Sequence, residues 1–425
     1  MADFLNLMSQ TWAIRALCAA GLVGIMCGVL GCFIVLRNMS LIGDALSHAV
    51  LPGVVVAFLL VGLSTFGFFV GAVVAGLLAA LLITWIQQNV RTKNDAAIGI
   101  VFTAMFSLGV MGISWLSHGQ GVHLDLKDFL FGNILGVSDA DLWLTLGVAI
   151  LVISSVALFY RYLFVTTFQS VVAQVMGISV QTVHYFLMLL LSFSIVAALR
   201  TVGVILVVAM LITPASTALL LSDRLRNVLW ISGLMGALSA ILGFVAAVLL
   251  ETTPGPAMCV VATLLYFLTV LFAPKKGFVR KLMQKQALKQ RIELEDVLKG
   301  AMKLDLKNEP DNGLNFENLA KKLTISDAQL KKHLNHLKQQ KLLQFEENTG
   351  QISLDTGGVE IASKLVRAHR LWETFLATEM GLSEEQVHED ADLLEHFLSE
   401  ELLNEVDEHL GFPETDPHGS PIPKQ

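Results

Sequence analysis

Asp44 and His48 form a pair of polar, ligand-type residues within the apolar segment 43–53, GDALSHAVLPG. On a helix, residues four positions apart share one face. A carboxylate and an imidazole on one face suit a divalent transition metal such as Mn, Fe or Zn. Pro52 and Gly53 predict a kinked or broken helix directly afterwards, which would free backbone carbonyls near the pair. We interpret the pair as a metal site, and the alternative is a hydrogen bond that only joins helices.

Glu251 is a second acid in an apolar context, at the end of an apolar run and before another Pro/Gly break. Ionisable residues are costly inside a membrane and usually mark functional sites. Glu251 therefore either completes the site of Asp44 and His48 or caps a helix interface, and the sequence leaves both interpretations open.

A larger set of ligand-type residues lies near the C-terminus, in HRLWE (369–373) and VHEDADLLEH (387–396). Its members follow the helical spacings of three and four, and they are His369, Glu373, His388, Asp392, Glu395 and His396. A solvated acidic helix does not explain this regular placement. Imidazoles and carboxylates without thiolates favour Mn or Fe over a zinc site with soft ligands.

Residues 315–355 have the rhythm of a winged helix-turn-helix. We expect a helix at 315–323, a turn with N-cap chemistry at 324–327, an amphipathic helix at 328–343, and a hairpin at 344–355 as the wing. The second helix would enter a DNA major groove, and its contact candidates are Ser326, Gln329, Lys331 and Lys332. Winged helices also serve as protein-contact modules, so DNA binding and a structural role are equally open.

The elements that must position these residues belong to two different parts of the 425-residue chain. Only 15% of all residues are charged, against about a quarter in soluble domains, which argues against an ordinary cytosolic enzyme. Residues 1–273 hold 9 basic and 9 acidic residues, whereas residues 274–425 hold 20 and 27 and so carry the whole net charge of −7. The first part therefore predicts a multi-span membrane domain and the second a soluble domain.

The first part contains apolar stretches of spanning length, because a hydrocarbon core of about 30 Å needs about 20 helical residues. They predict eight or nine transmembrane helices, and the count is open at 183–221, where Arg200 interrupts one long run. Basic residues mark the cytoplasmic side, and Lys275 with Lys276 opens the tail. We therefore expect a multi-pass protein of the plasma (inner) membrane with a cytoplasmic C-terminal domain.

The tail is expected to comprise a basic linker helix (275–292), a winged helix-turn-helix (293–360) and a helical metal-binding domain (361–425), after a transmembrane domain at 1–274. Residues 275–370 include 19 basic and 12 acidic residues, whereas residues 371–425 include 1 basic and 15 acidic residues. This order favours nucleic-acid contact first and cation binding second. The fold class is thus an all-α polytopic membrane bundle followed by these cytoplasmic modules.

Three stretches of the first part, 36–60, 126–142 and 199–221, resemble the permease subunit of ABC importers for manganese, zinc and iron. The resemblance implies a helical bundle that pairs with a second copy or a sister permease. It also implies an extracytoplasmic metal-binding protein and a separate ABC ATPase, and the chain has no GxxxxGK[ST] phosphate loop of its own. The segment 168–179 resembles the short helix that contacts the ATPase, with Ala173 and Gly177 as its candidates. The resemblance places the metal at Asp44 and His48, with Glu251 as a further candidate.

Residues 293–423 resemble metal-dependent repressors of the diphtheria-toxin-repressor type, through RAHRLWE, VHEDADLLEH and GFPETDPHGSPIP. The resemblance adds Asp296 to the ligands named above and implies dimerisation. Asp392 replaces a thiolate and Asp296 a thioether of the iron-type members, which favours manganese. Manganese members have an acid where this chain has Lys299, and this departure puts a complete two-metal site in doubt. Within these 425 residues we expect no counterpart of the third, SH3-like domain of longer repressors.

We therefore expect a divalent-metal importer permease, with Mn as the preferred ion and Fe or Zn as alternatives, and with a fused metal-responsive domain. It would not itself be an enzyme. The rival interpretation is a membrane-tethered metal-dependent transcriptional repressor, with DNA as a partner. A single anchor would suffice for that role, however, without an Asp–His pair inside the membrane.

Overall fold

The computed structural model describes residues 10–62, 64–90, 93–120, 132, 134–305, 314–380, 391–392 and 394–423. They form two units, Met1–Lys281 and Leu282–Gln425. Each unit has a hydrophobic core of its own. The first consists of apolar helices, and the second of amphipathic helices with one small sheet.

The helices of the first unit follow the apolar stretches of the sequence. They are α2 (Thr11–Leu36), α3 (Leu41–Ala49), α4 (Leu51–Val61), α5 (Thr65–Asn89), α6 (Asn94–Gln120), η1 (Ile134–Gly136), α8 (Asp139–Leu158), α9 (Tyr160–Phe168), α10 (Ser170–Val175), α11 (Val180–Leu221), α12 (Leu225–Leu249) and α13 (Pro254–Phe272). Within the described part of the chain, eight helices are long and apolar enough to cross a membrane, with Leu41–Val61 taken as one. This agrees with the predicted membrane bundle.

The long helix α11 explains why the number of spans was open between eight and nine. It has 42 residues, which is about 63 Å at 1.5 Å per residue and twice the hydrocarbon thickness of about 30 Å. Its helical geometry is broken at Gly203, where φ is 78° and ψ is 168°. The element therefore consists of two halves, each long enough to span.

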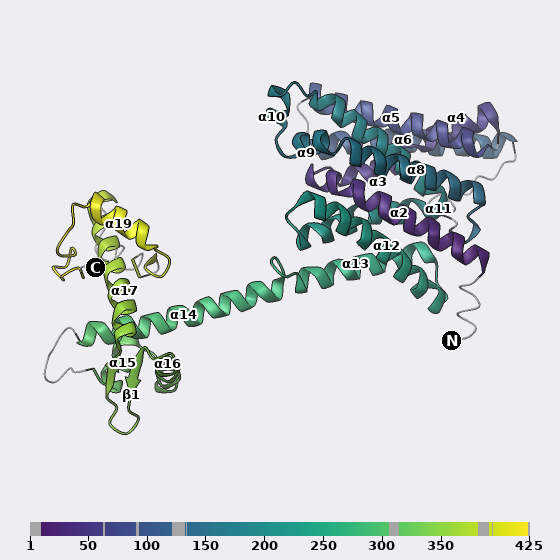
Figure 1. Cartoon of the computed structure of the whole chain (residues 1–425). Coiled ribbons are helices and arrows are strands. Elements are labelled where there is room, and N and C mark those ends of the chain that lie inside the picture. The colour runs from purple at the N-terminus through teal and green to yellow at the C-terminus, as the bar shows by residue number, and fades with distance from the viewer. Residues whose placement is uncertain are drawn as a thin grey trace. The chain divides into compact units, whose positions relative to one another are not determined.

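Small residues let α2 pack directly along α11 and α12 (Figure 1). A Cβ atom at Gly24 would lie 2.5 Å from the carbonyl oxygen of Gly236, and one at Gly31 would lie 1.8 Å from that of Leu211. The Ser232 hydroxyl also donates a hydrogen bond of 2.7 Å to a backbone carbonyl of α2. In lipid, helices associate through such close van der Waals and polar contact, and α2 is buried along most of its length.

The predicted metal pair lies on α3, which is followed at once by α4. Val50 joins the two helices with helical dihedrals, φ −77° and ψ −16°, and Pro52 occupies the first turn of α4. Proline has no N–H and so interrupts the helical hydrogen-bond ladder. The chain thus has the expected interruption, but it stays close to a helical path instead of opening into a loop. α3 packs against α6 and α11.

The second unit contains a winged helix-turn-helix followed by further helices, as predicted. Its elements are α14 (Phe278–Asp305), α15 (Phe316–Leu323), α16 (Asp327–Gln339), β1 (Leu343–Phe345), β2 (Ile352–Leu354), α17 (Thr356–Met380) and α19 (Glu400–His409). β1 and β2 pair antiparallel with Gln344 opposite Ser353, and Gly350 adopts φ 69° in the turn between them. One core joins α14, α15, α16 and the hairpin, and another joins α17 to α19.

The helix α16 is shorter than the predicted helix at 328–343. It ends at Gln339, and Lys341 has φ 59°, a left-handed conformation that does not continue a right-handed helix. Leu343 then begins β1 and is buried in the core of the winged helix. Burial of this leucine in the hairpin therefore outweighs the helical periodicity that suggested a longer helix.

Candidate metal centres

The first candidate centre is the pair Asp44 and His48 on α3. His48 Nε2 lies 3.6 Å from Asp44 Oδ1, which is too long for a good hydrogen bond. The ring of His48 meets Phe102 and Phe106 of α6 edge-on, with centroids 5.4 and 5.2 Å apart. These aromatics hold the imidazole in place, and Asp44 remains about half exposed, at 47%.

The second ring nitrogen of His48 bears on the two interpretations of this pair. Nδ1 is buried and has no hydrogen-bond partner among the described residues. An unsatisfied buried polar group costs about 1–3 kcal/mol. A purely structural Asp44–His48 contact leaves this cost unexplained. A metal bound by the imidazole through Nδ1 would provide the missing partner.

Glu251 is not brought to this pair by any described contact. It lies in the turn after α12, is exposed and adopts a left-handed φ of 53°. Within the part of the chain that the structure describes, no ion pair or hydrogen bond joins Glu251 to Asp44 or His48. Glu251 as a third ligand therefore stays a prediction without structural support.

The predicted ATPase contact is a short helix with an apolar exposed side. α10 is followed by Gly177, which adopts φ 77° and turns the chain toward α11. Ala173 is fully buried, whereas Val171 and Val175 are 71% and 84% exposed. Ala173 and Gly177 thus shape this segment, and the two valines leave an apolar side of it exposed.

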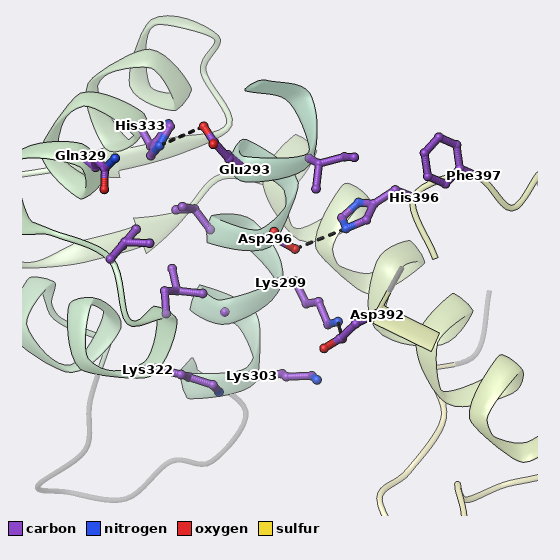
Figure 2. Close-up of a pocket in the computed structure, with 15 residues that line it drawn as sticks. Glu293, Asp296, Lys299, Lys303, Lys322, Gln329, His333, Asp392, His396 and Phe397 are labelled. Carbon is purple, nitrogen blue, oxygen red and sulfur yellow. Dashed lines mark hydrogen bonds and ion pairs between the residues drawn. The ribbon is translucent and has the colours of Figure 1, made fainter. Parts of the chain in front are cut away.

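The second candidate centre lies where α14, α17 and residues 391–392 and 394–396 meet. The ligand atoms here form two groups, and the atoms within each group all lie within 4.8 Å of one another. Asp296, Glu395 and His396 form one group, and His369, Asp392 and Glu395 form the other. Figure 2 shows Asp296 and His396 facing each other, with His396 Nε2 3.3 Å from Asp296 Oδ1. The borderline and hard donors of the first group suit a divalent transition metal.

Glu295 supports the first group and was missed by sequence reasoning. Its carboxylate lies 2.7 Å from His396 Nδ1 and is also bound by Arg291 Nε at 2.7 Å. A carboxylate on the far nitrogen of a ligating histidine orients the ring and makes it a stronger ligand. Its neighbour Asp296 drew attention through the family resemblance, but no spacing rule distinguishes a supporting acid from a solvated one.

Lys299 occupies the second group. Its side chain is 8% exposed, and Nζ donates to Asp392 Oδ1 at 2.6 Å and to both oxygens of Glu395 at 2.6 and 2.7 Å. His369 Nδ1 lies 3.3 Å from the same Nζ. The departure noted in the sequence is therefore a lysine ammonium among three candidate metal ligands.

His369 and Glu373 form a buried pair at the end of this network. His369 Nε2 lies 3.0 Å from Glu373 Oε1, and both side chains are 2% exposed. Burial alone would lower the pKa of His369, but its hydrogen bonds to Glu373 and Glu395 outweigh burial and raise the pKa. His388, the other histidine predicted for this centre, lies outside the described residues.

His396 also has a raised pKa. Burial again acts to lower the pKa, and the hydrogen bonds to Asp296 and Glu295 outweigh it. A metal binds only the unprotonated nitrogen, so protons compete with metal here. The centre opens into a cavity of about 750 Å³ lined by residues of α14, α15, α16 and the 392–397 segment, as Figure 2 shows.

The four predicted DNA-contact residues lie at the start of α16 and are differently engaged. Ser326 is the N-cap residue, and its hydroxyl donates to the Gln329 side chain at 3.1 Å. Gln329 also lines the cavity of the metal centre. Lys331 forms an ion pair of 3.0 Å with Glu347 of the wing, whose pKa it lowers. Lys332 is exposed on the same helix.

Comparison with known proteins relates both parts of the chain to described families. The model of the ABC 3 transport family matches residues 9–273. The model of the iron dependent repressor, metal binding and dimerisation domain, matches residues 356–424.

Individual relatives and one solved structure also resemble this chain. The manganese transport system membrane protein MntC of Halalkalibacterium halodurans is 50% identical over 278 residues, which are 65% of this chain and 93% of that protein. The Bacillus subtilis protein of the same name is 35% identical over 396 residues, which are 92% of this chain and 88% of that protein. The solved structure of PsaBC from Streptococcus pneumoniae in complex with Fab matches with a TM-score of 0.59 and 40% identity, over 66% of this chain and 98% of the other. The chain therefore belongs to the ABC 3 transport family and carries a repressor-type metal-binding domain in residues 356–424.

Proposed function

We propose that the protein is the permease subunit of an ABC importer for divalent transition metal, with Mn(II) as the preferred cargo. Manganese is favoured because the relatives above are named as manganese transport proteins. The observation that carries the proposal is the buried, unpartnered Nδ1 of His48 beside Asp44 inside a membrane-spanning segment. A divalent ion passing through the bundle would use these ligands during alternating access.

The proposal includes partners that the chain does not itself supply. A separate ATPase would dock on the exposed valines of α10, and an extracytoplasmic binding protein would deliver the metal. A second permease copy or a sister permease would complete the pathway. The tail would lie in the cytoplasm, because the basic residues at its start are typical of that side.

Uptake of radioactive manganese by cells that express variants tests the cargo site. We expect Asp44→Asn and His48→Ala to lose at least about tenfold in uptake, the equivalent of about 1.4 kcal/mol, at unchanged amounts in the membrane. His184→Ala is the matched control, because His184 lies on α11 and contacts Thr84 instead. Uptake at the normal level in either site variant would refute the site.

We propose further that the tail senses cytosolic metal in place and restrains import when metal is abundant. In support, Lys331 of α16 forms an ion pair with Glu347 of the wing. Glu346, which precedes Glu347, adds negative charge where DNA phosphates would approach. Metal must then bind the tail with different affinity in the two states of the permease.

Deletion of residues 282–425 distinguishes sensing from the rival role as a tethered repressor. A sensor predicts that the truncated permease continues to import at high external manganese. A repressor predicts unchanged transport per molecule, together with manganese-dependent retardation of promoter DNA by the full chain in detergent.

A further inference from the structure

Lys299 is a buried cation placed where ligand atoms converge. Its Nζ lies within 2.7 Å of three carboxylate oxygens, from Asp392 and Glu395, and 3.3 Å from His369 Nδ1. Glu395 is fully buried, with 0% of its side chain exposed. One ammonium group thus serves two carboxylates, of which Glu395 is buried and Asp392 is half exposed.

A metal ion cannot share this space with the ammonium group. Divalent ions bind carboxylate oxygens at about 2.0–2.6 Å, and Nζ already lies 2.6–2.7 Å from these oxygens. A metal there would overlap the nitrogen and place two positive charges in contact.

In the neighbouring group of ligands, Lys299 binds Glu395, whereas no described hydrogen bond joins it to Asp296 or His396. Asp296 Oδ1 and Glu395 Oε1 lie 3.3 and 3.6 Å from His396 Nε2. In Figure 2 the Lys299 side chain points toward Asp392, while Asp296 and His396 face each other. Both groups share Glu395, so two metals would be bridged by its carboxylate.

We propose that the Lys299 ammonium is a built-in cation that replaces one ion of a metal pair, leaving Asp296, Glu395 and His396 to bind a single divalent ion. This inference rests on the proposed metal-sensing function of the tail. Lys299 already joins α14 to His369 of α17 and to Asp392 and Glu395 before metal binds. The sensor would therefore respond in one step to a single ion.

The test counts manganese bound to the full chain in detergent micelles. Asp44→Asn and His48→Ala are present throughout, so that the cargo site does not contribute. Equilibrium dialysis with Mn(II) gives the number of bound ions, and electron paramagnetic resonance distinguishes an isolated ion from a spin-coupled pair. We expect one isolated ion per chain, and Lys299→Glu is expected to bind one more and to give a coupled pair.

Lys303→Glu is the matched control, because Lys303 lies one turn further along α14 and lines the same cavity. This variant carries the same charge change, and it is expected to keep one isolated ion. His396→Ala is expected to remove the bound ion, even if Lys299→Glu does not fold.

The outcomes separate this inference from the function on which it rests. A coupled pair in the chain with Lys299 intact, or no additional ion in folded Lys299→Glu, would overturn the inference alone. Retention of one ion by His396→Ala would overturn it as well. A tail that binds no manganese at all would overturn the proposed sensing function itself.

Discussion

Replacement of Lys299 by methionine is expected to destabilise the C-terminal unit strongly. The substitution removes the ammonium and keeps an unbranched side chain in its place. It leaves Glu395, with 0% of its side chain exposed, and Asp392 without their cation. Removing one partner of a buried ion pair costs about 3–5 kcal/mol, because the remaining charge is desolvated and uncompensated.

Hydrogen exchange of the α17 amides around His369 measures this loss. These amides lie in the buried part of the helix, so their slowest exchange reports opening of the unit. A cost of about 3–5 kcal/mol corresponds to exchange that is faster by about two to nearly four orders of magnitude. The additional substitution Glu395→Gln should recover part of the loss, because it removes the stranded charge.

Lys303→Met is the control for loss of a lysine on the same helix. Lys303 is only partly buried, and both burial and the neighbouring Lys299 lower its pKa. Its removal should change the exchange rates little. Equal exchange rates in the native chain and Lys299→Met would refute the view that Lys299 holds the centre together.

Three further outcomes are expected. Gly31→Ala should reduce the stability of the membrane unit to heat by about 1–3 kcal/mol, because its Cβ would lie 1.8 Å from the carbonyl oxygen of Leu211. Gly21→Ala is the control and should leave the stability unchanged, because its Cβ would have no atom within 4 Å. The raised pKa of His396 keeps its proton bound to higher pH, so the manganese affinity of the tail should fall on acidification. Calorimetric titration at several pH values measures this affinity, and an affinity that rises on acidification would contradict the prediction. Val175→Asp should lower uptake at unchanged protein level, since charge would disrupt an apolar ATPase contact, and unaltered uptake would exclude α10 as the docking site.

The fold was largely predictable because its signals are local. Length and apolarity determine which helices can span a bilayer, and both are properties of continuous stretches. The winged helix was visible for the same reason, in amphipathic spacing and a turn sequence. The prediction failed at the end of α16, because the burial of Leu343 depends on a core that also includes α14 and α15, and local spacing does not show that core.

The membrane bundle, the ligand types of both centres and the spacing that places Asp44 with His48 and His369 with Glu373 could all be read from the sequence. The surroundings of these residues required the folded chain: the aromatic edges and unpartnered nitrogen at His48, the support of His396 by Glu295, and the lysine among Asp392, Glu395 and His369. Ligand spacing follows from helical periodicity, whereas the occupancy of a site depends on charges that α14, α17, Asp392 and Glu395 bring together. Lys299 is 93 to 96 residues away from the acids it binds, so no local pattern could show that its ammonium lies where a metal ion would bind.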